Sequence, residues 1–319
     1  MLTSITIWDE KAIDISDDIS ELTKLGVSVQ SVPLFHSQDP QKIITDLSGT
    51  DFLIAGSERL DSSTLPSLKK LKLIVRFGVG YDNVDLKCAE KCGIAVANLP
   101  GSNAFAVAEH VLGMMIAVTH RMVPYTEAIK ANRIQTGISD SLCGTVGILG
   151  FGAIGKKLSG LLLPFGVRIL ACDPSVGVEE MRQYGAEKAD MDQTIRASDL
   201  LTLHLPATPE TYHLVNQEFL LKMKDGAYLF NTARGSLMDE SAVAEALASG
   251  KLAGVGADVY EMEPLDGTSP LRTAKNVILT PHTATATLAC FHAVMRAAAH
   301  QIVLFYEGKP MEHLLTKPL

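Results

Sequence analysis

One stretch, residues 145–173, constrains the fold more than any other part of the chain: TVGILGFGAIGKKLSGLLLPFGVRILACD. It begins with an apolar run, residues 146–149, whose length suits a buried parallel strand. Glycines with the spacing G-x-G-x-x-G follow, and leucines then recur at helical intervals until a proline and a glycine end the helix. A second apolar run, residues 167–171, leads to Asp173. This order predicts a strand, a tight turn, a helix, a second strand and an acidic residue.

The residue types in this stretch suit a dinucleotide. Gly150 can adopt the positive φ of a tight turn, Gly152 lets a pyrophosphate approach the backbone, and Gly155 lets the helix pack closely on the strand. The first N–H groups of the helix and the positive end of its dipole face the phosphates. Asp173, 18 residues beyond Gly155, can accept hydrogen bonds from both ribose hydroxyls and would repel a 2′-phosphate. The stretch therefore predicts an NAD site. An ordinary glycine-rich turn is the alternative, but the flanking strands, helix and acid favour the dinucleotide.

Length and charge limit the other functions. With 319 residues the chain can form two domains, and 47% apolar with 20% charged residues is typical of a globular protein. The net charge of −8 argues against a nucleic-acid surface. The N-terminus lacks a positive region, and residues 8–10 interrupt its apolar run, so no signal peptide is expected. The most apolar helical stretch, residues 111–118, is too short to span a bilayer. We expect a cytoplasmic protein with no membrane segment and no nucleic-acid partner.

The five cysteines are scattered along the chain. Cys88 and Cys92 are four residues apart and could in principle share a metal ion. No second Cys or His pair with ligand spacing lies nearby in the sequence, so we expect reduced structural thiols and no metal site.

Short strands alternate with helices along the chain, which predicts α/β architecture with doubly wound parallel sheets. In the first part we expect strands at residues 4–8, 27–33, 52–55, 73–76 and 94–97, and helices at residues 15–25, 41–47, 65–68 and 86–91. After the glycine-rich stretch we expect strands at residues 200–204, 227–231, 255–258 and 277–279.

Two features divide the chain into domains. Residues 98–101, Asn-Leu-Pro-Gly, are typical of a linker. The last helix, expected at residues 288–306, is too small to stand alone and should return to the first domain. We therefore expect a discontinuous domain, residues 1–101 and 284–319, that contains an inserted domain, residues 102–283.

The first helix of the inserted domain is unusually apolar. It is expected to begin at Ser102 or Asn103 and to be apolar around its whole circumference at residues 111–116, so it should be covered on all sides. Another domain or a second subunit could cover it. Glu109 is expected to be buried there as a hydrogen-bonded structural carboxylate.

Polar residues follow the expected strands. Ligands of open α/β sheets bind at the carboxyl ends of the strands. That rule selects Pro206, Thr232, Arg234, Asp258, Glu263 and His282. A cation, a carboxylate and an imidazole are therefore expected at the same edge as the Gly150 turn. In the first domain, the glycines in residues 76–82 can present backbone N–H groups to an anion, with a plain turn as the alternative.

Several motifs occur together and in order: FGVGYDNVD at 77–85, AVAEH at 106–110, GFGAIG at 150–155, LHLPATPET at 203–211, FNTARGS at 230–236, DVYEMEP at 258–264 and PHTA at 281–284. On these motifs the chain resembles the D-isomer-specific 2-hydroxyacid dehydrogenases over nearly its whole length, and looks closest to their phosphoglycerate-dehydrogenase-like branch. The resemblance implies a Rossmann NAD-binding domain inserted into a discontinuous flavodoxin-like substrate-binding domain, and a homodimer formed through the NAD-binding domain.

The resemblance also implies a reaction, the transfer of hydride between NAD(H) and C2 of a small 2-hydroxy or 2-oxo acid. Candidate acids are 3-phosphoglycerate, hydroxypyruvate and glyoxylate. Arg234, Glu263 and His282 would be catalytic. His282 as imidazolium would protonate the carbonyl oxygen, and Glu263 would favour that charged form. Arg234 would bind the substrate carboxylate through a forked pair.

Further residues carry over from the family motifs. Cofactor-binding residues would be Gly150, Gly152, Ala153, Ile154, Gly155, Asp173, Pro206, Thr232, Ala233 and Asp258. Substrate-binding residues would be Arg76, Gly78, Val79 and Gly80, with Arg234 and His282. An arginine at position 76 can equally be structural.

Two other functions occur on the same scaffold. Transcriptional corepressors that sense NAD(H) resemble the enzymes at the catalytic positions, although this chain lacks long disordered tails and basic patches. Formate or phosphite oxidation is the third interpretation. Formate enzymes pair the histidine with glutamine, whereas this chain has Glu263. The dehydrogenase is favoured.

Overall fold

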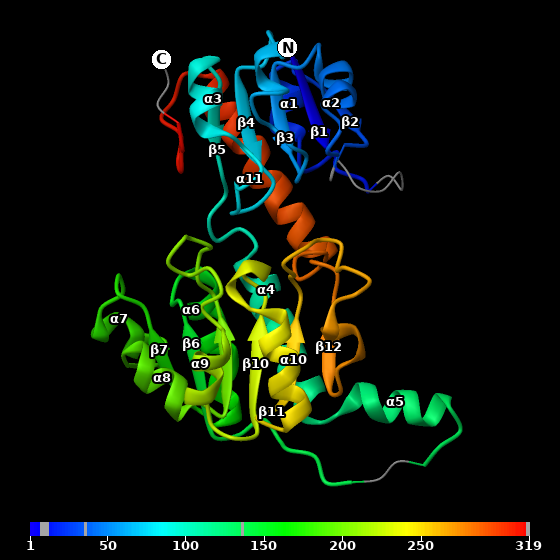
Figure 1. The fold of residues 1–319 in the computed structure, drawn as a ribbon. Helices are drawn as coiled ribbons and strands as arrows, with labels where there is room; N and C mark the ends of the chain where they lie inside the picture. The colour runs from blue at the N-terminus through cyan, green and yellow to red at the C-terminus, as the bar shows by residue number, and fades with distance from the viewer. Residues whose placement is uncertain (7–12, 35–36, 135–136, 317–319) are drawn as a thin grey trace. The chain divides into compact units, whose positions relative to one another are not determined.

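The computed structural model describes residues 1–6, 13–34, 37–134 and 137–316. The chain forms two compact units (Figure 1). Unit 1 comprises Met1–Asn103 and Thr287–Leu319, and unit 2 is Ala104–Ala286. The chain therefore leaves unit 1 at Asn103 and returns to it at Thr287.

Unit 1 contains a five-stranded sheet of order β2-β1-β3-β4-β5, in which every pair is parallel. Its strands are β1 (Leu2–Thr6), β2 (Ser28–Val32), β3 (Phe52–Ala55), β4 (Leu73–Arg76) and β5 (Ala95–Ala97). Its helices are α1 (Ser20–Lys24), α2 (Pro40–Leu47), η1 (Leu65–Ser67), α3 (Leu86–Lys91) and α11 (Leu288–Tyr306). This strand order is that of flavodoxin-like folds.

The last helix, α11, completes the core of unit 1. It packs against β4 and α1. Phe291 stacks at a tilt on Phe77 with ring centroids 5.3 Å apart, and Phe305 meets Phe52 edge-on at 5.9 Å. Of the described helices, α11 alone is long and apolar enough to cross a membrane by length and composition, and eight of its residues are buried in the protein, as in a core helix.

Unit 2 contains a seven-stranded sheet of order β12-β11-β10-β9-β6-β7-β8, again parallel throughout. Its strands are β6 (Thr145–Leu149), β7 (Arg168–Cys172), β8 (Glu187–Lys188), β9 (Leu200–Leu203), β10 (Ala227–Asn231), β11 (Leu252–Ala257) and β12 (Val277–Leu279). Counted from β6, this is the Rossmann order 3-2-1-4-5-6 with one added strand. The predicted fold class is confirmed.

The helices of unit 2 are α4 (Ala104–Thr119), α5 (Met122–Lys130), α6 (Ala153–Leu162), α7 (Val178–Gln183), α8 (Met191–Ala197), α9 (Gln217–Lys222) and α10 (Glu240–Ser249), with short η2 (Leu163–Phe165), η3 (Gly235–Leu237) and η4 (Pro270–Thr273). Of these, α4 packs on α6 and β11. Figure 1 shows α5 extending away from the sheet.

The register of the unit 2 sheet matters most for function. Backbone pairing places the last residues of six strands in one row: Leu279, Ala257, Asn231, Leu203, Leu149 and Cys172. Residues that follow these six therefore lie along a single edge of the sheet.

Some expectations need correction. Glu109 is exposed, not buried, because it lies on the face of α4 opposite to the buried residues Val107 and Val111. Within the single chain Gly113 is exposed and Leu112 is half-buried, so the expected cover of residues 111–116 on all sides would need a second subunit. The first strand is Leu2–Thr6, while residues 7–8, expected to belong to it, lie outside the described residues, as do Asp9 and Glu10.

Gly147, in the middle of β6, tests the packing of unit 2. A Cβ at this position would lie 2.0 Å from Ser198 Oγ and 2.8 Å from Leu201 Cδ1. We expect Gly147→Ala to lower the free energy of unfolding by about 1–3 kcal/mol through overpacking. Gly160→Ala on α6, where a Cβ meets no atom within 4 Å, should raise it by about 0.5–1 kcal/mol. The apparent midpoints of thermal unfolding check both, and equal midpoints for the two variants would contradict the packing described.

Candidate active site

The glycine-rich turn joins β6 to α6. Gly150 has φ +93°, and a Cβ there would lie 2.3 Å from the carbonyl oxygen of His204. Both facts require glycine. A Cβ on Gly155 would lie 2.6 Å from the carbonyl oxygen of Gly150, so helix and turn are in close contact.

The start of α6 suits an anion. Its N-cap is Gly152, which is exposed and provides no side-chain cap, whereas α10 begins with Asp239, whose carboxylate accepts hydrogen bonds from the first turn. The first N–H groups of α6 therefore have no capping side chain and can bind phosphate oxygens. Ala153 is exposed and Ile154 half-buried beside them.

Asp173 follows β7 directly and lies next to the turn. Its Oδ2 accepts a hydrogen bond from the backbone N–H of Phe151 at 2.8 Å, and its Oδ1 accepts one from Ser175 at 2.8 Å. The carboxylate is thus held beside the glycine-rich turn, as a ribose-binding acid requires. Thr232, at the same edge, has a buried Oγ1 with no hydrogen-bond partner among the described residues. These features fit a dinucleotide. Pro206 is exposed beyond β9.

The Arg234 turn is built by a residue that the sequence analysis missed. Asn231, fully buried at the end of β10, accepts a hydrogen bond from the N–H of Ala233 at 3.0 Å and donates one to the carbonyl of Arg234 at 2.9 Å. In the sequence, a polar residue at the end of an apolar strand is the feature that could have indicated this role of Asn231. Gly235 brings this turn onto the next loop, because a Cβ on it would lie 1.8 Å from the carbonyl carbon of Tyr260.

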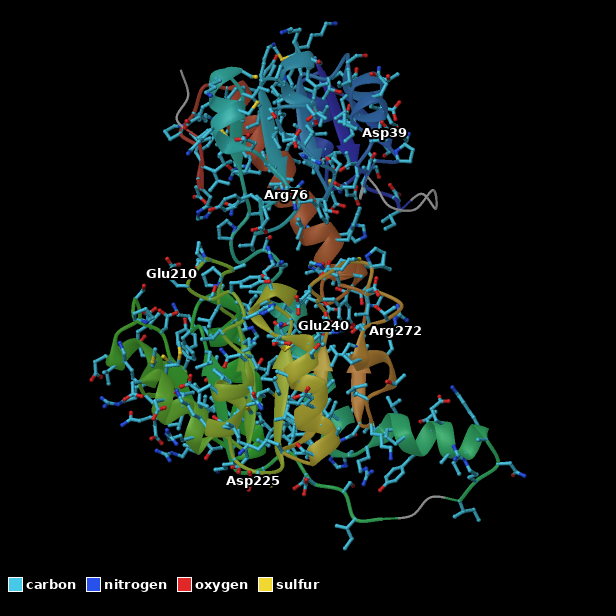
Figure 2. The ribbon with its side chains drawn as sticks, in the orientation of Figure 1. Asp39, Arg76, Glu210, Asp225, Glu240 and Arg272 are labelled. Atoms are coloured by element: carbon cyan, nitrogen blue, oxygen red, sulfur yellow. The ribbon has the colours of Figure 1, made fainter. Side chains whose placement is uncertain are left out.

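The loop that carries Glu263 is tied to α10. Glu240, labelled in Figure 2 at the start of that helix, accepts a hydrogen bond from the N–H of Glu261 at 3.0 Å. Its own N–H donates to the Glu261 carboxylate at 3.2 Å. Asp225 marks the opposite end of the sheet in the same view. Glu263 Oε1 then accepts from the N–H of Tyr260 at 3.2 Å.

His282 lies on the loop after β12 and has φ +53°, an uncommon conformation for a non-glycine residue. Its N–H donates to the carbonyl of Asp258 at 2.7 Å. The buried Asp258 carboxylate accepts from Thr280 Oγ1 at 2.6 Å and from the N–H groups of Thr283 and Ala284 at 2.8 and 2.9 Å. Asp258, expected near the cofactor, therefore holds the loop of His282.

Glu263 and His282, 19 residues apart in sequence, meet at this edge. His282 Nδ1 lies 2.7 Å from Glu263 Oε2. The hydrogen bond to Glu263 raises the pKa of His282 above its ordinary value, against the effect of burial. Burial opposes ionisation of Glu263, but the hydrogen bond and charge of His282 outweigh it and lower the pKa of Glu263. The positive charge of Arg234 acts on both partners.

The expected substrate residues of unit 1 lie at the end of β4. Arg76 is buried, and it donates from Nε to the carbonyl of Gly80 at 2.9 Å and from Nη1 to that of Ala55 at 2.5 Å. These bonds hold the loop that contains Gly78, which has φ +132°, and the exposed Val79. The guanidinium thus has a structural part in this loop.

Near Arg76 lies a carboxyl group that the sequence analysis missed. Glu58 is fully buried, and Thr6 Oγ1 donates to its Oε2 at 3.0 Å. Burial raises the pKa of Glu58 to about 7, and the charge of Arg76 opposes that rise. A buried acid at this sheet edge could not be predicted from Ser57-Glu58-Arg59, whose polar pattern is typical of an exposed loop.

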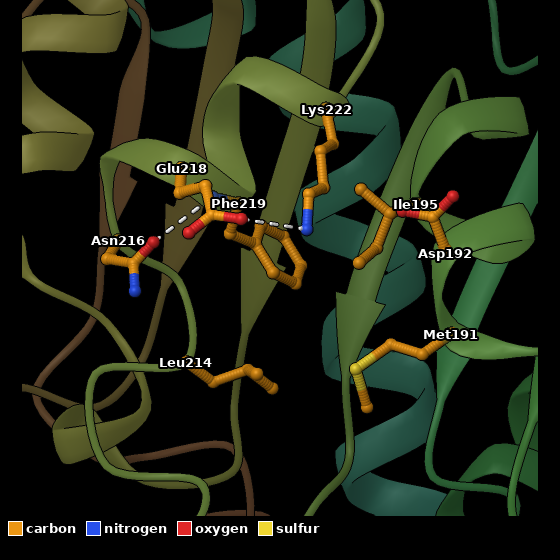
Figure 3. Close-up of a pocket in the computed structure, with 8 residues that line it drawn as sticks. All are labelled: Met191, Asp192, Ile195, Leu214, Asn216, Glu218, Phe219 and Lys222. Atoms are coloured by element: carbon orange, nitrogen blue, oxygen red, sulfur yellow. Dashed lines mark hydrogen bonds and ion pairs between the residues drawn. The ribbon is translucent and has the colours of Figure 1, made fainter.

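A separate cavity of about 280 Å³ lies between α8 and α9 (Figure 3). Its lining residues are Met191, Asp192, Ile195, Leu214, Asn216, Glu218, Phe219 and Lys222. None of them belongs to the candidate site.

Comparison with known proteins identifies the family of the chain. The family model described as D-isomer specific 2-hydroxyacid dehydrogenase, NAD binding domain, matches residues 112–284, which are more than half of the chain. The chain belongs to this family. Its unit 2 contains the family's NAD-binding domain.

Curated relatives carry two names. A D-3-phosphoglycerate dehydrogenase of Archaeoglobus fulgidus is 33% identical over 282 residues, which are 87% of this chain and 54% of that protein. A glyoxylate reductase of Aeropyrum pernix is 35% identical over 271 residues, 82% of this chain and 81% of that protein. The chain thus spans about half the length of the first relative and about four-fifths of the second.

Solved structures share the whole fold. The apo structure of D-lactate dehydrogenase from Escherichia coli has a TM-score of 0.84 with 27% sequence identity, and the match covers 99% of this chain and 100% of that chain.

The charge of Glu263 can be tested without any substrate. Glu263→Gln keeps the shape of the side chain but removes the negative charge that stabilises the imidazolium, so the pKa of His282 should fall. The measurement is an NMR titration of the histidine rings, with His282→Ala assigning the signal. Glu245→Gln, an exposed glutamate on α10, is the matched control and should leave the titration unchanged. An unaltered His282 pKa in Glu263→Gln would contradict the described pairing.

Proposed function

We propose that the protein is an NAD-dependent D-2-hydroxyacid dehydrogenase, equivalently a 2-oxoacid reductase. The observation that carries this proposal is the 2.7 Å contact between His282 Nδ1 and Glu263 Oε2 at the edge of the sheet that also holds the Gly150 turn. A histidine whose pKa is raised by a carboxylate is a suitable general acid near neutral pH.

The cofactor proposed here supplies the hydride when it is bound. The uncapped N–H groups at Ala153 and Ile154 would hold the pyrophosphate, and the Asp173 carboxylate would accept hydrogen bonds from the ribose. The buried Oγ1 of Thr232, which has no hydrogen-bond partner among the described residues, would contact the nicotinamide end of the cofactor. Asp173 would disfavour NADP, because it places a negative charge where a 2′-phosphate would lie.

His282 would move the proton. Its Nδ1 is engaged by Glu263, so Nε2 is the nitrogen that would give a proton to the carbonyl oxygen during reduction and take it back during oxidation. Glu263 would fix the ring and stabilise the imidazolium. The positive charge of Arg234 acts on this pair. The guanidinium of Arg234 would bind the substrate carboxylate through two parallel hydrogen bonds.

The substrate class follows from these groups and from the names of the relatives. Arg234 as the partner of a carboxylate and His282 as a proton donor suit a small 2-oxo acid. Glyoxylate, hydroxypyruvate and the 3-phosphoglycerate couple are the candidates, the first and last in keeping with the relatives' names. Within unit 1, the backbone N–H groups of Val79 and Gly80 would bind an anionic group. We place the reaction in the cytoplasm.

The reaction is tested by NADH oxidation with purified protein against glyoxylate, hydroxypyruvate, phosphohydroxypyruvate, pyruvate and phenylpyruvate, with NADPH in parallel. We expect rapid turnover of at least one acid with NADH. His282→Ala should lower kcat by about 10²–10⁴-fold, since the general acid is lost. His300→Ala, an exposed histidine of α11, is the control and should retain activity. Preference for NADPH would contradict the role of Asp173, and NADH binding without reduction of any acid would contradict the proposed activity.

We also propose a homodimer formed through unit 2. Figure 1 shows α5 extending away from the sheet. Apolar side chains on α5 and on the residues that follow it are exposed. Ile129 is 69% exposed, Ile134 91% and Ile138 98%. Several exposed apolar residues on one projecting segment are typical of an interface.

Ile129→Asp tests this dimer. A carboxylate within the proposed interface would be desolvated on association, so we expect at least about a tenfold weaker dimer. Leu221→Asp on α9 is the matched control, because Leu221 has a nearly equal exposed fraction of 68%. Sedimentation equilibrium measures both. A wild-type monomer, or equal association of both variants, would show that the projecting segment is no interface.

A further inference from the structure

Tyr260 touches both loops that carry the proposed acid–base pair. Its backbone N–H donates to Glu263 Oε1 at 3.2 Å. Its hydroxyl donates to the carbonyl of Thr280 at 2.9 Å and lies 3.1 Å from the carbonyl of Ala257. The side chain is only 6% exposed. One buried residue therefore contacts the Glu263 carboxylate and the backbone two residues before His282.

The Thr280 carbonyl, which accepts the hydrogen bond of the Tyr260 hydroxyl, also contacts the backbone of His282. The same Thr280 oxygen accepts the N–H of His282 at 3.0 Å. The hydroxyl of Thr280 donates to Asp258, whose carboxylate holds the rest of the loop. Tyr260 thus adds a side-chain contact to a short loop whose backbone at His282 already has the strained φ of +53°.

The hydroxyl remains a donor under working conditions. Burial raises the pKa of Tyr260 well above its ordinary value, and the negative charges of Asp258, Glu240 and Glu263 raise it further. Phenylalanine would fill the same space without this donor. The hydroxyl, rather than the ring, is therefore the group that distinguishes a positioning function from core packing.

We propose that Tyr260 is a positioning residue for the acid–base pair: its N–H orients the Glu263 carboxylate, and its hydroxyl holds the loop of His282 against it. The reason is that a carboxylate stabilises the imidazolium only while their separation and orientation are kept. This inference rests on the proposed function for its catalytic meaning, although the geometry itself can be tested in the protein alone.

Three groups face His282 and decide its protonation. Glu263 and Asp258 raise its pKa, while Arg234 and burial lower it. Tyr260 carries no charge, so it would act on His282 only through geometry. Without the hydroxyl the contact between Glu263 and His282 loosens, its stabilisation of the imidazolium weakens, and the pKa of His282 falls.

The test is Tyr260→Phe with Tyr228→Phe as the matched control. Tyr228 is also buried, 7% exposed, and its hydroxyl also makes a hydrogen bond, but it lies at the start of β10, at the end of the sheet opposite to His282. Loss of a hydroxyl should lower the thermal midpoint of both variants. Only Tyr260→Phe should lower the pKa of His282 in an NMR titration of the protein without substrate.

Turnover gives the second measurement. In the reducing direction His282 must be protonated, so activity is lost as the pH rises through its pKa. For Tyr260→Phe we expect this alkaline limb to move to lower pH, kcat to fall about tenfold, and KM for the oxo acid to stay within about twofold. Tyr228→Phe should keep the wild-type profile.

The outcomes separate the two proposals. An unchanged His282 titration in Tyr260→Phe, or an equal change in Tyr228→Phe, would overturn the positioning function of Tyr260. If wild-type protein reduces no oxo acid, the proposed reaction fails, while the titration still supports or overturns the structural link between Tyr260 and His282.

Discussion

The parallel register of the unit 2 sheet is the constraint on which the candidate site depends. Because six neighbouring strands end in one row, residues that follow them meet at one edge although they are scattered from Gly150 to His282. The sheet supplies proximity without any side-chain contact. What it does not supply is orientation, since each loop beyond the edge has its own freedom. The Gly150 turn is limited by its close approach to His204, but the loops of Arg234, Glu263 and His282 need further contacts.

Those contacts come from buried polar side chains whose hydrogen bonds go to backbone groups. Asn231 closes the turn of Arg234, Asp258 gathers the N–H groups around Thr283, and Tyr260 joins two loops. Burying such groups is costly unless their hydrogen bonds are satisfied, and here the partners are the loop backbones themselves. The same bonds that satisfy the side chains therefore restrict the loops. This explains how His282 keeps an uncommon φ, because its N–H is bonded and its neighbours are held by Asp258.

The sequence predicts the sheets better than the site. Strands at Phe52–Ala55, Leu73–Arg76, Ala227–Asn231 and Val277–Leu279 have the predicted bounds, because a buried parallel strand is a short apolar run with polar neighbours. β11 begins three residues before the predicted 255, since Gly254 and Gly256 interrupt the apolar pattern although both are buried. The burial of Glu109 was predicted wrongly because an apolar helix still has one face that the sheet does not cover. The contacts of Asn231 and Tyr260 could not be predicted at all, since they depend on which carbonyl groups of distant loops face them.

The electrostatics of the pair connect folding with the proposed chemistry. The pKa of His282 is raised in the folded protein, so its contribution to stability is present below the ordinary value of 6.5 and is lost as the pH rises through the folded pKa. The pKa of Glu263 is lowered, so its contribution is present above the ordinary value of 4.5 and is lost as the pH falls through the folded pKa. Between these two values both groups are charged and the interaction is complete. The raised pKa extends the imidazolium form of His282 to pH values above 6.5, where the proposed reductase would need a proton donor. The loop contacts therefore keep the Glu263 carboxylate within hydrogen-bond distance of His282, which stabilises the folded protein and would favour the imidazolium needed for the proposed reduction.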